Sequence, residues 1–309
     1  MAHPVLIDTD MGVDDAVAMV LALCAPEIDL VGVTSVGGNV SLDQVTQNIG
    51  RLLSGLRLDS WPVLGRGLDQ DQPGLQDATH VFGSDGLGDV DLPVPSDFAV
   101  ESFLDVYEQL IEAHGHALRI VAMGPLTNLA AVMKERPGLL EKVGQIVVMG
   151  GAFWCPGNVT PYAEFNFYRD PRAAQTVLTS RLPITVVPLD VTVQVALDES
   201  HTAHLSRSGT RGGELLARMI QYPLVHGTDA TPGGFLAHDA LTVGVLLWPA
   251  LFLRSKMAID VVTSGEQAGR CKPKIAKDKS RQLAVVISVN VVDFLENLLE
   301  QLCQERFVV

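Results

Sequence analysis

Four aspartates within eight residues follow a short apolar run near the start of the chain. They are Asp8, Asp10, Asp14 and Asp15. Ionised carboxylates this close repel one another, and burying an unpaired one costs roughly several kcal/mol. No Lys or Arg precedes Arg51, so no side chain nearby in the sequence supplies the compensating charge. A bound metal ion is the natural partner, and oxygen-only ligands favour Ca²⁺ or Mg²⁺ over zinc.

The residues around this cluster predict a strand, a tight turn and a helix. Val5–Asp8 is typical of a buried parallel strand, and Ala16–Cys24 is typical of a mostly buried helix. Gly12 lies between them, where a tight turn needs a backbone without the constraints of a Cβ atom. Asp14 and Asp15 would open the helix, where its dipole favours carboxylates. Helix capping explains one or two of the aspartates, whereas a ligand site at the carboxyl end of the strand explains all four.

The chain alternates between apolar strand candidates and helical stretches, which predicts right-handed βαβ units. The strands expected in the first two thirds are Val5–Asp8, Leu30–Ser35, Pro62–Leu64, Leu118–Met123, Gln145–Met149 and Ile184–Pro188. The helices expected between them are Asp14–Cys24, Leu42–Leu56, Asp97–His114, Leu126–Lys134 and Pro171–Ser180. The last third adds helices near Ser200–Ser206, Gly213–Tyr222 and Asp239–Leu247, strands at Ala258–Val262 and Leu283–Val289, and a closing helix at Val291–Cys303. We expect one α/β domain over residues 1–309, with a mostly parallel, Rossmann-like sheet flanked by helices and extra C-terminal strands and helices.

Composition and charge exclude several function classes. The net charge of −14 opposes binding to nucleic acid, whose phosphates it would repel. The longest apolar run, Ala240–Leu253, is too short to span a membrane and contains Pro249, so we expect a core helix there. The chain starts without a basic n-region or a cleavable apolar stretch, and its four cysteines are widely separated. These features predict a cytoplasmic protein with reduced thiols.

Later strand ends carry turn and polar residues that would project to the same edge of a parallel sheet. The second strand ends in Val36–Asn39, another is followed by Met123–Asn128, and a third ends in Met149–Gly151. Glycines at such positions let the backbone approach a ligand closely. Their recurrence on one edge indicates a binding site there.

Two further stretches carry candidate site residues. Asn158–Asn166 places two amides and the Glu164 carboxylate beside Phe165, a combination suited to several hydroxyl groups and to the apolar face of a sugar. Asp239 precedes an apolar helix and is either its N-cap or a further metal ligand. The neighbouring His238 could be a structural histidine.

These motifs, in this order, resemble those of the nucleoside hydrolases, which are calcium-dependent N-ribohydrolases of the inosine-uridine type. The resemblance rests on Asp8–Ala16, Val36–Asn39, Met123–Ala130, Val148–Gly151, Asn158–Asn166 with Asp170-Pro171, Leu189–Thr192 and His238-Asp239. It implies hydrolysis of the N-glycosidic bond of a ribonucleoside to free base and ribose. It also implies a homodimer or homotetramer.

The resemblance assigns roles to individual residues. Calcium would be held by the carboxylates of Asp10, Asp15 and Asp239 and by the backbone carbonyl of Met123. The residues matching the family's ribose contacts are Asp14, Asn39, Asn158, Glu164 and Asn166, with Met149 near the sugar. Asp10 would accept the proton of the attacking water, and His238 is the candidate donor to the leaving base. Asp8 becomes a supporting residue at the strand end.

The sequence departs from the family pattern mainly on the side of the base. Met11 stands where the family usually has proline, Phe82 where a histidine is frequent, and Ser84 where a glutamate is frequent. Phe82 could stack on a base but could not protonate it. Tyr222 and His226 stand in a second segment, residues 222–235, where the family often has tyrosines. The sequence therefore predicts the ribose site and leaves the preferred base open.

Two alternatives fit parts of the pattern. A haloacid-dehalogenase-type Mg²⁺-dependent phosphatase also opens with Asp-x-Asp after its first strand, and there Asp8 would be the nucleophile and Asp10 the acid/base. That interpretation leaves Asn158–Asn166 and the His238-Asp239 pair unexplained. A nucleoside- or ribose-binding protein that has lost turnover is favoured by the altered base-side residues and opposed by the intact carboxylate set.

Overall fold

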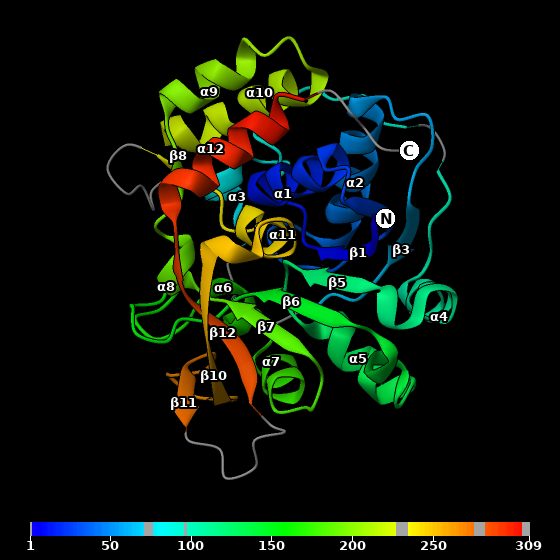
Figure 1. Cartoon of the computed structure of the whole chain (residues 1–309), viewed down its shortest axis with the longest axis vertical. Coiled ribbons are helices and arrows are strands. Elements are labelled where there is room, and N and C mark those ends of the chain that lie inside the picture. Colours follow the sequence, from blue (N-terminus) through cyan, green and yellow to red (C-terminus); the bar gives the residue numbers. More distant parts are fainter. Residues whose placement is uncertain (1, 71–76, 96–97, 227–233, 275–281, 305–309) are drawn as a thin grey trace.

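A central sheet of ten strands organises the described part of the chain (Figure 1). The computed structural model describes residues 2–70, 77–95, 98–226, 234–274 and 282–304. Its strand order is β11-β10-β12-β7-β6-β5-β1-β2-β3-β4. The strands are β1 (His3–Thr9), β2 (Ile28–Ser35), β3 (Val63–Arg66), β4 (Glu101–Ser102), β5 (Arg119–Ala122), β6 (Gln145–Met149), β7 (Ile184–Val187), β10 (Phe252–Val261), β11 (Cys271–Lys274) and β12 (Leu283–Val289). All neighbours from β12 to β4 pair in parallel, and β10 and β11 add antiparallel strands at one edge.

Helices cover both faces of this sheet, as Figure 1 shows. On one side lie α1 (Val13–Cys24), α2 (Leu42–Leu56), α9 (Glu199–Ser206), α10 (Arg211–His226), α11 (Ala240–Leu247) and α12 (Val291–Leu302). On the other side lie α4 (Phe103–His114), α5 (Thr127–Glu135) and α7 (Pro171–Leu178). Short helices α3 (Thr79–Phe82), α6 (Phe165–Arg169) and α8 (Leu189–Thr192) and the small β8–β9 sheet (Ala196–Leu197 with Phe235–Leu236) stand at the strand ends. None of the described helices has the length and apolar character needed to cross a membrane.

Side-chain alternation along β1 divides the core into two layers. Val5 and Ile7 belong to the cluster formed with α1, α2, α11 and α12, whereas Leu6 belongs to the cluster formed with α4, α5 and α7. Successive side chains of a strand point to opposite faces, so one apolar run serves both layers. Every residue of α1 is buried, which explains why its sequence is apolar nearly all round.

The predicted α/β architecture is confirmed, with differences at element boundaries. The helix expected over Asp239–Leu247 is confirmed as α11, whereas a core helix over the whole apolar run Ala240–Leu253 is wrong, because β10 begins at Phe252. Trp248 and Pro249 break the helix, since proline cannot supply the next helical N–H. The helix expected from residue 97 begins at Phe103, after the two-residue strand β4, and residue 97 itself lies outside the described residues.

The topology places a binding crevice at the carboxyl end of β1. This strand pairs with β2 on one side and with β5 on the other. The chain therefore reverses its direction of progress across the sheet between β1 and β5, and ligands bind at such switch points. The segments that follow β1, β2, β5 and β6 meet there, and these are the segments that carry the strand-end motifs.

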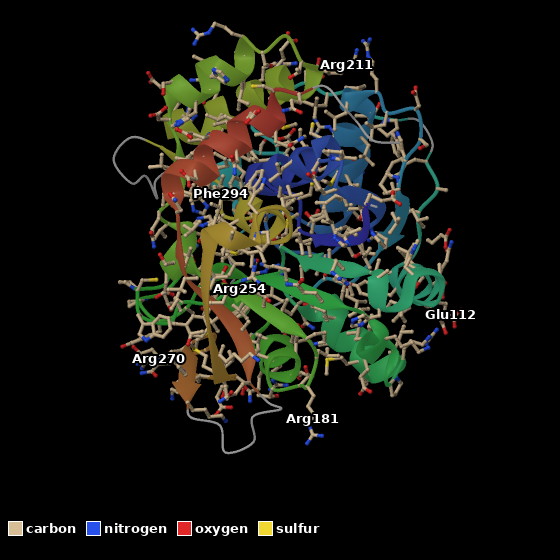
Figure 2. All side chains as sticks on the ribbon, viewed as in Figure 1. Glu112, Arg181, Arg211, Arg254, Arg270 and Phe294 are labelled. Carbon is tan, nitrogen blue, oxygen red and sulfur yellow. The ribbon has the colours of Figure 1, made fainter. Side chains whose placement is uncertain are left out.

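We expect Phe294→Ala to lower the free energy of unfolding by about 3–5 kcal/mol, the usual range for truncating a buried phenylalanine. Figure 2 labels Phe294 on α12, where it is fully buried against the rings of Trp248 and Phe252, with centroids 5.6 and 5.9 Å away. Urea unfolding measures the loss. Val292→Ala on the same helix, at a side chain that is 64% exposed, should cost less than about 0.5 kcal/mol. Equal losses in the two variants would contradict this packing.

Candidate active site

The turn between β1 and α1 carries the first carboxylates of the site. Met11 adopts the positive φ of this turn, 40°, whereas φ of Gly12 is −92°. The expected conformational reason for Gly12 is therefore wrong, and its need for glycine is spatial. A Cβ atom on Gly12 would lie 2.8 Å from Asn39 Nδ2 and 3.0 Å from the Phe82 ring. The absent side chain lets both residues pack against the turn.

Three carboxylates converge beside this turn. One oxygen each from Asp14, Asp15 and Asp239 lies within 4.8 Å of the other two, and all three residues are buried. Asp15 accepts hydrogen bonds from Thr9 Oγ1 at 2.5 Å and from the Gly12 amide at 2.8 Å. Asp14 Oδ1 and Asp239 Oδ1 have no hydrogen-bond partner among the described residues. Asp239 stands at the N-cap position of α11 without a side-chain capping bond, so capping does not account for it.

The protonation behaviour of these carboxyls reflects crowding in a buried site. Burial raises the pKa of Asp14 to about 8, and the Asp15 charge adds to the effect. Burial and the charges of Asp14, Asp15 and Asp10 raise the pKa of Asp239 well above its usual value. A bound cation would favour the ionised forms and engage the two unpaired oxygens. The buried, all-oxygen donor set fits a hard divalent ion.

Asp10 lies next to this cluster in a close-packed glycine cradle. Its Oδ2 accepts a hydrogen bond from the Asn39 amide at 2.9 Å. A Cβ atom on Gly38 would lie 2.0 Å from Asp10 Oδ2, and one on Gly124 would lie 3.1 Å from Asp10 Cβ. The glycines that follow β2 and β5 therefore let two loop backbones pack against Asp10, Gly38 against its carboxylate and Gly124 against its Cβ and backbone nitrogen.

A buried hydrogen-bond network ties the strand ends together beneath the site. Asp8 Oδ1 accepts hydrogen bonds from Thr34 Oγ1 at 2.5 Å and from Asn128 Nδ2 at 2.7 Å. Asn128 also donates to the Ser35 carbonyl and accepts from the Leu68 amide. This one amide links β1, β2 and the segment after β3 to the start of α5. Asp8 thus supports the site from below, as predicted.

A cavity of about 140 Å³ opens above the carboxylates. A single water needs roughly 10–15 Å³ by this measure, so a small organic molecule can enter. The predicted residues that line it are Asp10, Asp14, Asn39, Phe82, Met123, Met149, Asn158, Glu164, Phe165, Asn166, His238 and Asp239. Asp15 is fully buried and does not line the cavity.

Backbone amides position the Asn158–Asn166 segment along one wall. Glu164 is the N-cap of α6 and accepts from the amides of Asn166, Gly151 and Phe167 at 2.7, 2.8 and 3.1 Å. Asn166 Nδ2 donates to the Met123 carbonyl at 2.6 Å. Asn158 Oδ1 accepts from the Phe165 amide at 3.0 Å. These contacts fix the loop and leave its polar side chains facing the cavity.

Helix α8 holds a loop and a histidine near the cavity. Asp190 accepts from three successive loop amides, those of Phe153, Trp154 and Cys155, at 2.9, 2.7 and 3.0 Å. Thr192 Oγ1 lies 2.7 Å from His238 Nδ1. Burial lowers the pKa of His238 to about 4, so this imidazole is neutral at pH 7. The Leu189–Thr192 motif thus positions both the loop and the histidine.

Comparisons with known proteins identify the family that has this site. The family model described as inosine-uridine preferring nucleoside hydrolase matches residues 5–296. The chain belongs to this family. The resemblance found in the sequence is confirmed, and as a nucleoside hydrolase the protein is an N-glycosyl hydrolase that cleaves ribonucleosides.

Individual relatives support the same assignment. The pyrimidine-specific ribonucleoside hydrolase RihA of Citrobacter koseri is 36% identical over 270 residues, which cover 86% of this chain and 86% of that protein. Uridine nucleosidase 1 of Arabidopsis thaliana is 36% identical over 263 residues, covering 84% of this chain and 78% of that protein. The solved structure of a purine-preferring ribonucleoside hydrolase from Gardnerella vaginalis matches with a TM-score of 0.91 at 30% identity, over 99% of this chain and 100% of that chain.

Family membership also removes the phosphatase alternative. A phosphatase of that type needs the first aspartate of the pair as an exposed nucleophile. Asp8 is fully buried, is bonded to Thr34 and Asn128, and does not line the cavity. It therefore cannot attack a substrate bound there.

The base side of this nucleoside hydrolase differs in detail from the expected one. Tyr222 and His226 stack on each other, with ring centroids 4.5 Å apart, and neither lines the cavity. Pro223, which lies between them in the sequence, does line it. Residues 227–233 of the predicted base-side segment lie outside the described residues. Ser84 bonds to Asp89 Oδ1 at 2.7 Å and does not line the cavity.

Two residues near the site were not anticipated from the sequence. His80 on α3 lines the cavity, although the sequence analysis considered only Phe82 in this helix. Arg169 on α6 is buried, lies 3.6 Å from Asp69 Oδ1, and weakly lowers the pKa of Asp10 against the larger effect of burial. No positive side chain near the aspartates precedes Arg51 in the sequence. Arg169 was missed because the fold brings this residue to Asp10 from far along the chain.

We expect Gly38→Ala to lower kcat/KM for ribonucleosides by at least about 100-fold. The added Cβ would collide with the Asp10 carboxylate, and a displacement of about 1 Å at a reacting group costs this much. Initial rates of ribose release measure the effect. Gly55→Ala on α2 is the matched control, since its Cβ would meet the Leu215 and Leu92 side chains at 3.3 Å and no other atom within 4 Å in the described part of the chain. Wild-type rates in Gly38→Ala would contradict the close packing around Asp10.

Proposed function

We propose that this nucleoside hydrolase uses Ca²⁺ bound to Asp10, Asp15, Asp239 and the Met123 carbonyl, with Asp10 as the general base. The observation that carries the proposal is the convergence of buried carboxylates, two of them with unpaired oxygens, at one end of a cavity. Asp14 belongs to the same cluster and also lines the cavity, so it can contact both the ion and the sugar.

The proposed roles of the ion and of the protein side chains can be separated. The chemistry that the ion supplies when bound is Lewis acidity toward water and ribose hydroxyl oxygens. Two of the proposed ligands, Asp10 and Asp15, are held in position by contacts with the protein itself. Asp15 is fixed by Thr9 and Gly12, and Asp10 by the Asn39 amide. These contacts orient the donor atoms before any ligand binds.

Asp10 is the proposed acceptor of the proton of the attacking water. It lines the cavity beside the cluster, and one of its oxygens is held by a backbone amide. N-glycosidic hydrolysis passes through an oxocarbenium-like transition state, and water attacks the anomeric carbon on the face opposite the base. A fixed carboxylate at that face deprotonates the water and stabilises the positive charge that develops on the ribose.

The polar wall supplies recognition of the ribose hydroxyls. The residues proposed for this role are Asp14, Asn39, Asn158, Glu164 and Asn166, with Met149 and Phe165 against the apolar face of the sugar. A deoxy sugar would leave buried polar groups without partners, so such a site favours ribonucleosides. His238 is the proposed donor to the leaving base. If the Thr192 hydroxyl donates to Nδ1, then Nε2 carries the proton of the neutral ring.

The proposal extends to the biological setting. Relatives of this chain include both pyrimidine-specific and purine-preferring enzymes, so the substrate panel should contain both classes of base. The family resemblance supports a homodimer or homotetramer, a role in nucleoside salvage and a cytoplasmic location. Neither nucleic acid nor membrane is part of the proposed function.

We expect Asp10→Asn to lower kcat by about 10²- to 10⁴-fold, the usual contribution of a general base. Asp43→Asn is the control, because Asp43 is exposed on α2 and its only described ion pair is with Arg66. A reducing-sugar assay over purine, pyrimidine and deoxy nucleosides, with and without EDTA, measures turnover. Undiminished turnover in Asp10→Asn would remove it from the mechanism.

The same assay separates hydrolysis from the binding-protein alternative. The wild-type protein should release ribose from at least one ribonucleoside, and EDTA should abolish that release. Calorimetric binding of a nucleoside without any release of reducing sugar would support a protein that has lost turnover.

A further inference from the structure

The cavity has an apolar half that is built by neighbouring elements. Its lining there consists of Ala78, Val81, Phe82, Pro223, Phe235 and Leu236. These residues belong to α3 and its N-cap, to α10 and to β9, and α10 packs against both of the other two elements. The carboxylates and amides assigned above to the ion and the ribose come from other elements. An apolar slot of this kind suits a flat heteroaromatic ring.

Helix α3 is fixed directly beside the ribose half of the cavity. The Ala78 amide donates to the Asn39 carbonyl at 2.8 Å, and the Phe82 ring contacts the turn at Gly12. Phe82 is buried, whereas His80 on the same helix is exposed and still lines the cavity. The helix thus presents an imidazole at the mouth of the apolar half.

His80 is chemically distinct from its neighbours in this half. Among the described lining residues from α3, α10 and β9, it alone has a side chain that can form hydrogen bonds. Its imidazole has no hydrogen bond, ion pair or ring contact within the described part of the chain. The second imidazole of the cavity, His238, is bonded to Thr192 through Nδ1 and stands next to the carboxylate cluster, so its Nε2 would reach the base from the ribose side while His80 stands on the apolar side.

We propose that His80 hydrogen-bonds to the edge of the nucleobase and assists its departure, an inference that rests on the proposed function. As the C1′–N bond breaks, its electron pair passes to the base, and the water oxygen bonds to C1′. A donor at the base edge stabilises the negative charge that develops there. Every natural nucleobase carries nitrogen or oxygen acceptors on its edge, so His80 can serve purine and pyrimidine leaving groups alike.

The test uses two kinds of substrate. The base of a nucleoside is a poor leaving group, so its departure needs this hydrogen bond. p-Nitrophenyl β-D-ribofuranoside carries the same ribose, but nitrophenolate departs without help. The variant His80→Phe keeps a ring of similar size and removes the hydrogen bond. His116→Phe changes an exposed histidine outside the cavity and is the matched control.

His80→Phe should lower kcat/KM for uridine and inosine by about tenfold or more, the size of one hydrogen bond at a reacting group. Its kcat/KM for the nitrophenyl riboside should stay within about twofold of wild type, and His116→Phe should match wild type on every substrate. Unchanged nucleoside rates in His80→Phe would overturn this inference alone. An equal loss on both substrate kinds would also overturn it, because it would show a structural role. A wild-type protein inactive on all substrates would overturn the proposed function and this inference with it.

Discussion

The carboxylates of Asp14, Asp15 and Asp239 repel one another at the end of a buried crevice. The rest of the site depends on how this repulsion is compensated. Burial alone raises the pKa of these groups, and their mutual charge raises it further for Asp14 and Asp239. Protonation would relieve the repulsion but would remove the charges that a sugar hydrolase needs. A bound cation would relieve the repulsion and keep the carboxylates ionised, so the charges that catalysis needs would depend on metal binding.

The fold meets this requirement by bringing separate strand ends to one point. Asn128 links β1, β2 and the segment after β3, and Asp8 holds it from below. Gly38 and Gly124 then let the loops after β2 and β5 close around Asp10. The polar residues that line the cavity are positioned in turn by capping and loop contacts, such as those of Glu164. The contacts therefore build on one another, from the sheet to the carboxylates and then to the polar lining of the cavity.

Much of this arrangement could be predicted from the sequence because it depends on local pattern. The apolar run before Asp8 predicts a buried strand, and the aspartates after it fall at the edge where parallel strands end. Sequence alone left Asp239 between cap and ligand, since both roles occur at the start of a helix. The structure favours the ligand role, because its side chain makes no capping bond and Oδ1 is unpaired. His80 was missed although Phe82 in the same helix was placed at the base side, because the exposed face of so short a helix cannot be predicted from sequence. Arg169 could not be found, because the fold brings it to Asp10 from far along the chain. The start of β10 at Phe252 shows a similar limit, because the apolar run that continues past Pro249 gave no sign that a strand begins there.

The central claim is that the carboxylate cluster holds one divalent cation, and isothermal titration of Ca²⁺ into EDTA-stripped protein tests it most directly. We predict one site per chain, and a rise in unfolding free energy of about 2.7 kcal/mol when free Ca²⁺ reaches 100 times its Kd. Asp239→Asn should weaken the binding by at least about tenfold, because it removes one charged ligand from the buried set. Absence of any binding heat with either Ca²⁺ or Mg²⁺, together with an unchanged unfolding midpoint, would contradict the claim.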